Sequence, residues 1–255
     1  MPDQALRIAL IGAESTGKTA LAQALVPRIQ ALTGLSCTWV PESLRAWCDT
    51  MGRTPQCEEQ GAIAASQQEA IDAAARRHAV VLCDTTPLMV AVYSQLIFDD
   101  VSLIAAALAW HQSCAATLLM ALDLPWVADG WQRDGAHVRA PVDTLLRELL
   151  VVHRLPWSVV SGSGDARCES AIDALAPLLR QRLALPGATT NTAANTTANT
   201  TSSATANTPT NAQRGLFSRL DQRNAEATAA RWTCESCDDP ECEHREQARQ
   251  RRAAS

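Results

Sequence analysis

The sequence predicts an α/β domain built on a five-stranded parallel sheet, and three observations lead to this prediction. Short apolar segments of strand length alternate with helical patterns from residue 1 to about 186, an order typical of parallel sheets covered by helices on both faces. The motif Gly12-Ala13-Glu14-Ser15-Thr16-Gly17-Lys18-Thr19 follows the first apolar segment and fits G-x-x-x-x-G-K-[ST]. Of the 22 lysines and arginines, only Lys18 in this motif is a lysine.

The expected elements follow from hydrophobic periodicity along the chain. The first strand, 6–11, leads directly into the motif, and Leu21, Leu25 and Ile29 then recur at helical spacing. Further strands are expected at 36–40, 79–84, 117–123 and 157–162, and further helices at 57–78, 87–98, 101–114, 141–153 and 166–184. Right-handed crossovers between parallel strands place ligands at the carboxyl ends of the strands.

The glycine-rich motif predicts a phosphate-binding loop, and hence the P-loop NTPase fold of the nucleoside- or nucleotide-kinase type. Backbone N–H groups of such a loop and of the following helix converge on phosphate oxygens. The compact ammonium of Lys18 can lie between two phosphate groups, and the hydroxyl of Thr19 would bind Mg²⁺. ATP and Mg²⁺ are therefore the expected cofactors. The expected nucleotide contacts are Gly12, Ala13, Glu14, Ser15, Thr16, Gly17, Lys18, Thr19 and Ala20.

Carboxylates follow two of the other expected strands. Asp84 ends the strand 79–84 and is expected to hold Mg²⁺, directly or through water. Glu42 follows the strand 36–40 on the acceptor side of the cleft, where a carboxylate could take a proton from an acceptor hydroxyl. Arg45 could hold Glu42 or an anionic group of the acceptor. The alternative is a surface helix start with an ion pair between residues three apart.

A candidate lid follows the fourth strand. The segment 123–139 is polar, contains glycine and carries Arg133 and Arg139. Phosphoryl transfer has to exclude water, and a closing lid with arginines that clamp the phosphates would do this. Arg133 is therefore a candidate catalytic residue and Arg139 a candidate nucleotide contact, with an ordinary solvated loop as the alternative. The loop 161–167 could line an adenine pocket, although glycine is common after strands.

The chain changes character near residue 187, which gives three expected parts. Residues 1–186 form the P-loop kinase-like domain. Residues 187–213 are almost entirely Thr, Asn, Ala and Ser, and predict a disordered linker. Residues 214–255 form a cysteine-rich tail, in which either a zinc site or a solvated acidic turn is expected. The candidate zinc ligands are Cys234, Cys237, Cys242 and His244.

Composition argues against several other classes of protein. The formal net charge of −5 argues against nucleic acid as the main partner. No apolar stretch is long enough to span a bilayer, and no basic leader opens the sequence. We therefore expect a cytoplasmic protein that acts on a small-molecule acceptor and binds neither nucleic acid nor a membrane. Its nine cysteines are expected to be thiols or metal ligands.

Together these motifs resemble the nicotinamide riboside kinase domain of NadR-type proteins and the wider family of NadR-like standalone P-loop ATPases, from about residue 6 to 185. The matching motifs are Gly-x-Glu-Ser-[Ser/Thr]-Gly-Lys-[Ser/Thr] at 12–19, Glu-x-x-Arg at 42–45, Gln-x-x-x-Ile-Asp at 67–72, Asp-Thr at 84–85 and Trp-Val-x-Asp-Gly at 126–130. Two positions depart from the family: Ser43 replaces an aromatic residue, and Thr86 replaces an aspartate.

The resemblance implies transfer of the γ-phosphoryl group of ATP to the ribose 5′-hydroxyl of nicotinamide riboside or a related nucleoside. It implies Glu42 or Asp84 as the base and Arg133 as a lid arginine. The resemblance also implies that Gln67, Trp126 and Asp129 lie on the acceptor side. Two other classes stay open on the sequence: a regulatory P-loop ATPase, and a nucleotide-sensing interaction protein that phosphorylates no small molecule.

Overall fold

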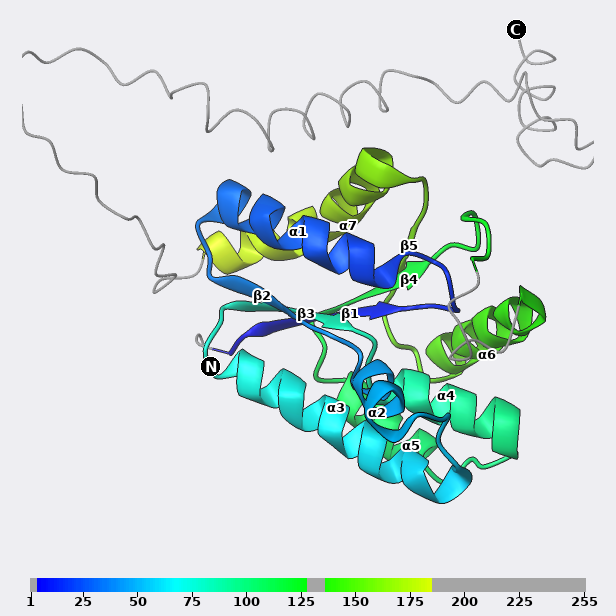
Figure 1. Ribbon diagram of the computed structural model, residues 1–255. Helices are drawn as coiled ribbons and strands as arrows, with labels where there is room; N and C mark the ends of the chain where they lie inside the picture. The colour runs from blue at the N-terminus through cyan, green and yellow to red at the C-terminus, as the bar shows by residue number, and fades with distance from the viewer. Residues whose placement is uncertain (1–3, 128–135, 185–255) are drawn as a thin grey trace, which may run out of the picture. The chain divides into compact units, whose positions relative to one another are not determined.

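A five-stranded sheet forms the centre of the computed structural model, which describes residues 4–127 and 136–184 (Figure 1). All its strands are parallel, in the order β2-β3-β1-β4-β5. The strands are β1 (Leu6–Ile11), β2 (Cys37–Val40), β3 (Val80–Asp84), β4 (Ala116–Met120) and β5 (Ser158–Val160). The predicted five-stranded parallel sheet of a P-loop protein is therefore confirmed.

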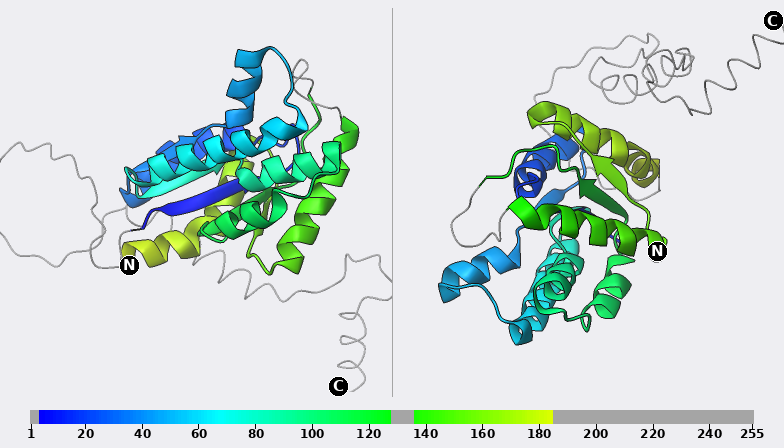
Figure 2. Two further views of the ribbon diagram at one scale, coloured as in Figure 1. Left: turned by 90° about the horizontal axis from the view of Figure 1, so that it is seen from below. Right: turned by 90° about the vertical axis from the view of Figure 1, so that its right-hand side faces the viewer.

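Helices cover both faces of this sheet. They are α1 (Lys18–Thr33), α2 (Ser43–Met51), α3 (Gln60–Ala75), α4 (Pro87–Phe98), α5 (Ile104–His111), α6 (Arg139–Val152) and α7 (Gly164–Ala184), with short turns η1 (Cys57–Glu59) and η2 (Ala136–Val138). Helices α1 and α7 pack together over one face, and α3, α4 and α5 lie on the other (Figures 1 and 2). Helix α6 packs against α4, and α2 packs against α3.

The helices expected from periodicity omitted one helix and misplaced several ends. Helix α2 was considered only as the alternative of a helix start at Glu42, although Leu44, Trp47, Cys48 and Met51 recur along it at helical spacing. The helix expected at 57–78 is η1 followed by α3, which ends at Ala75. The strand expected to reach residue 123 ends at Met120, and the chain then runs toward the phosphate-binding loop.

The central strands are buried on both faces, as continuous apolar segments in a parallel sheet should be. All five residues of β3 are buried, and the last four of β1 are fully buried. In the register between these strands, Leu10 pairs with Asp84. Asp84 therefore lies level with the end of β1, immediately before the glycine-rich motif begins.

Two expectations from the sequence, on membrane-spanning helices and on the state of the cysteines, can be compared with the described residues. No helix within 4–127 or 136–184 is long and apolar enough to cross a bilayer. The cysteines in these ranges are free thiols, as expected; they are Cys37, Cys48, Cys57, Cys83, Cys114 and Cys168.

Candidate functional site

The glycine-rich motif forms a tight loop between β1 and α1. Gly12 has φ of 146°, and a Cβ added there would lie 2.9 Å from the Cβ of Met120 in β4, so only glycine fits. Gly17, with φ of 77°, is the N-cap of α1. The hydroxyl of Thr16 donates to the carbonyl oxygen of Ala13 at 2.8 Å and closes the loop. This geometry turns the loop into the start of α1, where backbone N–H groups favour an anion.

Lys18 lies across the loop that precedes it. Its Nζ donates to the carbonyl oxygens of Gly12 at 2.8 Å and Ala13 at 2.9 Å. These bonds hold the ammonium over the concave side of the loop, and Lys18 lines the main cavity. A compact cation in this place can neutralise phosphate groups bound by the loop.

Thr19 and Asp84 meet at the carboxyl end of β3. The Thr19 hydroxyl donates to Asp84 Oδ2 at 2.5 Å. Asp84 is 1% exposed, and its Oδ1 has no hydrogen-bond partner within the described residues. Burial raises the pKa of Asp84, against the opposing effects of the Thr19 hydrogen bond and of the Lys18 and Arg45 charges.

This donor pair fits a magnesium ion. Mg²⁺ prefers oxygen ligands and commonly takes one carboxylate with phosphate oxygens and water. A buried carboxylate oxygen without a partner beside a threonine hydroxyl is the donor set that such an ion needs. Nowhere in the described ranges do three or more His, Cys, Asp or Glu side chains gather to hold a metal. A metal here would therefore depend on the phosphates for further ligands.

Glu42 faces the same space from the start of α2. Burial raises its pKa, and the neighbouring charges of Asp84 and Glu14 raise it further, whereas Lys18 and Arg45 lower it. Arg45 Nη2 lies 3.9 Å from Glu42 Oε2, so the ion pair between residues three apart is present. Glu42 also lines the main cavity. The two alternatives for Glu42 are thus compatible: it begins a helix, and its carboxylate belongs to the site.

One cavity of about 730 Å³, a volume typical of ligand pockets, connects Lys18, Thr19 and Glu42 to a second region. Asp84 is not among the residues that line this cavity. Its first side is the phosphate-binding loop and the start of α1. Its second side is formed by α2, α4 and the segment that precedes α3. The residues on that second side are Leu44, Arg45, Cys48, Thr54, Pro55, Gln60, Met89, Tyr93, Ile97 and Phe98.

A protein-family model described as an AAA domain matches residues 7–167. The chain belongs to this AAA domain family. The match spans the phosphate-binding loop, Asp84 and most of the sheet, which are the parts that form the site. No curated protein sequence matches the chain significantly.

Solved structures share the fold of this AAA domain at low sequence identity. A NadR protein in complex with NR is 18% identical, with a TM-score of 0.52, and the match covers 68% of this chain and 51% of that one. A NadR protein in complex with NAD and AMP-PNP is also 18% identical, with a TM-score of 0.50 and coverages of 69% and 50%. A thymidylate kinase from Ehrlichia chaffeensis is 14% identical, with a TM-score of 0.49 and coverages of 68% and 98%.

These matches show a NadR-like P-loop kinase fold. The chain spans about half the length of the NadR structures that it matches.

Gln67 holds the turn between β2 and α2, which carries Glu42. Its Oε1 accepts a hydrogen bond from the backbone N of Ser43 at 2.6 Å, and its Nε2 donates to the carbonyl oxygen of Pro41 at 3.3 Å. Gln67 is 1% exposed and is not among the residues that line the cavity. The AAA domain therefore uses this glutamine to hold the turn that carries Glu42, rather than to line the acceptor side as we expected.

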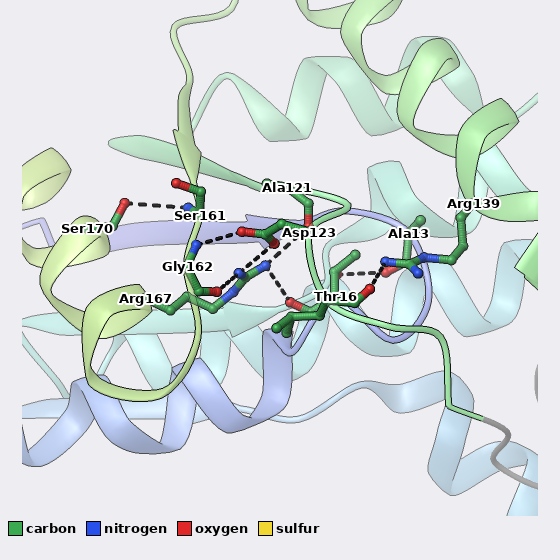
Figure 3. A network of polar contacts seen from close by, with 10 residues as sticks. Ala13, Thr16, Ala121, Asp123, Arg139, Ser161, Gly162, Arg167 and Ser170 are labelled. Atoms are coloured by element: carbon green, nitrogen blue, oxygen red, sulfur yellow. Dashed lines mark hydrogen bonds and ion pairs between the residues drawn. The ribbon is translucent and has the colours of Figure 1, made fainter.

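The chain after β4 lies against the phosphate-binding loop. Ser15 Oγ donates to the carbonyl oxygen of Val127 at 3.1 Å and accepts from the backbone N of Val127 at 3.2 Å. Arg139, at the start of α6, donates to the carbonyl oxygen of Leu124 at 2.8 Å (Figure 3). Arg139 and the half-buried Trp126 are not among the residues that line the cavity, which Leu124 and Val127 line instead.

Several predicted residues lie outside the described parts of the chain. These are Asp129 and Arg133 of the candidate lid and the candidate zinc ligands Cys234, Cys237, Cys242 and His244. The boundaries at 186–187 and 213–214 also fall outside.

Sequence reasoning missed two features of the site. Tyr93, the one tyrosine of the chain, and Phe98 line the second side of the cavity; their helix was predicted, but not which of its faces the cavity would meet. Arg167 lies buried beneath the phosphate-binding loop. The available signal was its place in the loop 161–167, which we had considered only as a wall for adenine.

Proposed function

We propose that this chain is an ATP-dependent small-molecule kinase that phosphorylates the ribose 5′-hydroxyl of nicotinamide riboside or a related nucleoside. The observation that carries the proposal is the single cavity that joins the phosphate-binding loop to a second, largely apolar region beyond Glu42 and Arg45. A protein that only senses a nucleotide needs no second region, whereas a phosphotransferase has to hold donor and acceptor together.

The donor side follows from the loop geometry. The loop amides and Lys18 bind the phosphates and offset their charge as phosphoryl transfer proceeds. Thr19 and Asp84 would hold Mg²⁺, which supplies further positive charge at the phosphates. Arg133 and Arg139 remain the proposed lid arginines, and in the described structure Arg139 already fixes the chain at Leu124.

The acceptor side provides a base. As the acceptor hydroxyl oxygen bonds to the γ-phosphorus and ADP leaves, a carboxylate takes the hydroxyl proton. Glu42 lines the cavity between its two regions, whereas Asp84 is bonded to Thr19 and suited to the metal. We therefore assign the base to Glu42 and the metal to Asp84, with Arg45 holding the Glu42 carboxylate.

The second region favours a nucleoside over a phosphorylated acceptor. Among the described residues on this side, Arg45 is the one cation, and it is paired with Glu42. The other members are neutral, and Tyr93 and Phe98 offer aromatic rings in a chain where Ser43 replaces the expected aromatic residue. A flat, uncharged or cationic base suits such a wall. The NadR structure in complex with NR supports this class of acceptor. Trp126 and Asp129 remain proposed acceptor-side residues.

The test is an assay of ADP release with MgATP, offered nicotinamide riboside and each common nucleoside in turn. At least one nucleoside should accelerate ADP release and yield a product that carries phosphate on its ribose 5′ oxygen. ADP release that no nucleoside accelerates would contradict the proposal and favour a regulatory ATPase.

Replacing Asp84 with Asn should raise the magnesium concentration needed for half-maximal activity by roughly tenfold. The change removes the negative charge that would hold the metal but keeps an oxygen that can accept from Thr19. The measurement is initial rate against Mg²⁺ concentration at fixed ATP. Asp143→Asn, on α6 and paired with Arg147, is the matched control and should leave this dependence unchanged. An unchanged magnesium requirement in Asp84→Asn would remove the metal assignment.

Replacing Tyr93 with Leu should raise KM for the acceptor by about three- to tenfold, because an aromatic contact is lost. KM for ATP should change little, since Tyr93 lies on the second side of the cavity and is not part of the phosphate-binding loop. Tyr93→Phe keeps the ring and should behave nearly as the wild type. Steady-state kinetics with both substrates check this, and equal effects of Leu and Phe would argue against stacking.

A further inference from the structure

Arg167 is a buried arginine that joins four segments of the chain. It lies in the first turn of α7 and is 3% exposed. Its Nη2 donates to the carbonyl oxygens of Thr16 at 2.9 Å and Ala121 at 3.2 Å. Its Nη1 donates to Asp123 Oδ1 at 2.8 Å and to the carbonyl oxygen of Gly162. Figure 3 shows the guanidinium at the centre of these contacts.

A closed ring of contacts fixes the guanidinium in place. While Asp123 Oδ1 accepts from Arg167, its Oδ2 accepts from the backbone N of Gly162 at 2.6 Å. Partial burial works to raise the pKa of Asp123, but the hydrogen bonds from Arg167 and Gly162 lower it overall, so its carboxylate is ionised. Because both residues of the ion pair also bind Gly162, the arginine cannot move without opening the loop after β5.

The contact with Thr16 sets the direction of one peptide of the phosphate-binding loop. A trans peptide directs its C=O and N–H to opposite sides, and the described chain has no cis peptide. With the Thr16 carbonyl drawn toward Arg167, the N–H of Gly17 is directed away from Arg167, and Gly17 lines the cavity. Glycine allows this peptide to rotate more freely than other residues do, so the peptide needs an external partner.

We propose that Arg167 is a positioning residue for phosphate binding, which holds the Thr16–Gly17 peptide so that the Gly17 N–H faces the bound phosphate. This inference rests on the phosphate-binding half of the proposed function and is independent of the acceptor. Lysine cannot replace Arg167, because four acceptors on three segments match the planar fork of a guanidinium and exceed the three donors of an ammonium.

The experiment measures direct binding of ATP and of inorganic tripolyphosphate by calorimetry, in the full chain and without acceptor. Tripolyphosphate has no nucleobase, so it reports on the phosphate-binding loop and Lys18 without any contribution from an adenine pocket. Arg167→Lys should weaken both ligands by at least about tenfold and by similar factors, as expected when a hydrogen bond to a charged group is lost. Arg182→Lys, a buried arginine in the last turn of the same helix, is the matched control and should leave both affinities unchanged.

Each outcome decides the inference. If Arg167→Lys weakened ATP but not tripolyphosphate, Arg167 would act only through the loop after β5, and the proposed role would be overturned. Unchanged affinity for both ligands would also overturn it. If Arg167→Lys did not fold, Asp123→Asn keeps an acceptor for Arg167 while loosening the ring, and should weaken tripolyphosphate by about threefold; no weakening there would overturn the role. A wild-type chain that binds neither ligand would overturn the proposed function as well.

Discussion

Lys18→Ala should lower turnover by about a thousandfold and leave the fold intact. The Lys18 ammonium is held by the carbonyl oxygens of Gly12 and Ala13, directly over the loop that would bind the phosphates. Loss of a preorganised positive charge from the transition state costs several kcal/mol, which corresponds to roughly this factor. The side chain is partly exposed at the cavity and does not belong to the core. Turnover and the thermal unfolding midpoint, measured on the same preparation, check both halves of the prediction.

Lys18→Arg is the matched variant, because it keeps the charge and changes only its shape. A planar guanidinium is too wide to follow the ammonium into contact with two successive carbonyl oxygens. We expect turnover nearly as low as in Lys18→Ala. The composition agrees with this expectation, since Lys18 is the one lysine of the chain and the other 21 of its 22 lysines and arginines are arginines. Near-normal turnover in Lys18→Arg would disprove the role given to Lys18.

The sheet and the phosphate-binding loop could be predicted because their signals are local. Each central strand is a largely apolar segment, and the strand, the glycine-rich loop and the helix follow one another directly from Leu6 to Gly34. The strand order β2-β3-β1-β4-β5, which we had not predicted, brings Asp84 level with the end of β1. The sequence assigned Thr19 and Asp84 to one magnesium site, and the structure brings these side chains, 65 residues apart, into contact.

Other parts of the site depend on contacts between distant residues that leave no local pattern. Arg167 meets Thr16 from 151 residues away, and nothing in its sequence neighbourhood indicates that it is buried. Gln67 was placed with the acceptor because of the resemblance, yet its two amide atoms bind the turn between β2 and α2. Part of the second side of the cavity is made by one face of α4, a largely apolar helix, so its periodicity could not indicate which face meets the cavity.

Glu42→Gln should lower turnover by about a hundredfold and leave ATP affinity nearly unchanged. General base catalysis typically contributes a factor of this order. Glu42 lines the cavity beyond the phosphate-binding loop, and Gln67 and Arg45 hold the turn and the carboxylate in place. Glutamine has a similar shape and can keep the contact with Arg45, but it cannot accept the proton. Turnover and ATP affinity, measured separately, check this. An effect on ATP affinity alone would place Glu42 on the donor side.

The pH dependence of turnover tests which carboxylate is the base. A base works only when it is deprotonated, and burial raises the pKa of Glu42, so wild-type turnover should fall as pH drops through a value above the ordinary range of glutamate. In Glu42→Gln the residual turnover should lose this acid limb. Glu148→Gln, an exposed glutamate on α6, should keep the wild-type profile. Asp84 has to be ionised to hold Mg²⁺, so an acid limb that persists in Glu42→Gln at saturating Mg²⁺ would assign the proton transfer to Asp84, whereas a limb that added Mg²⁺ removes would report only its binding of the metal.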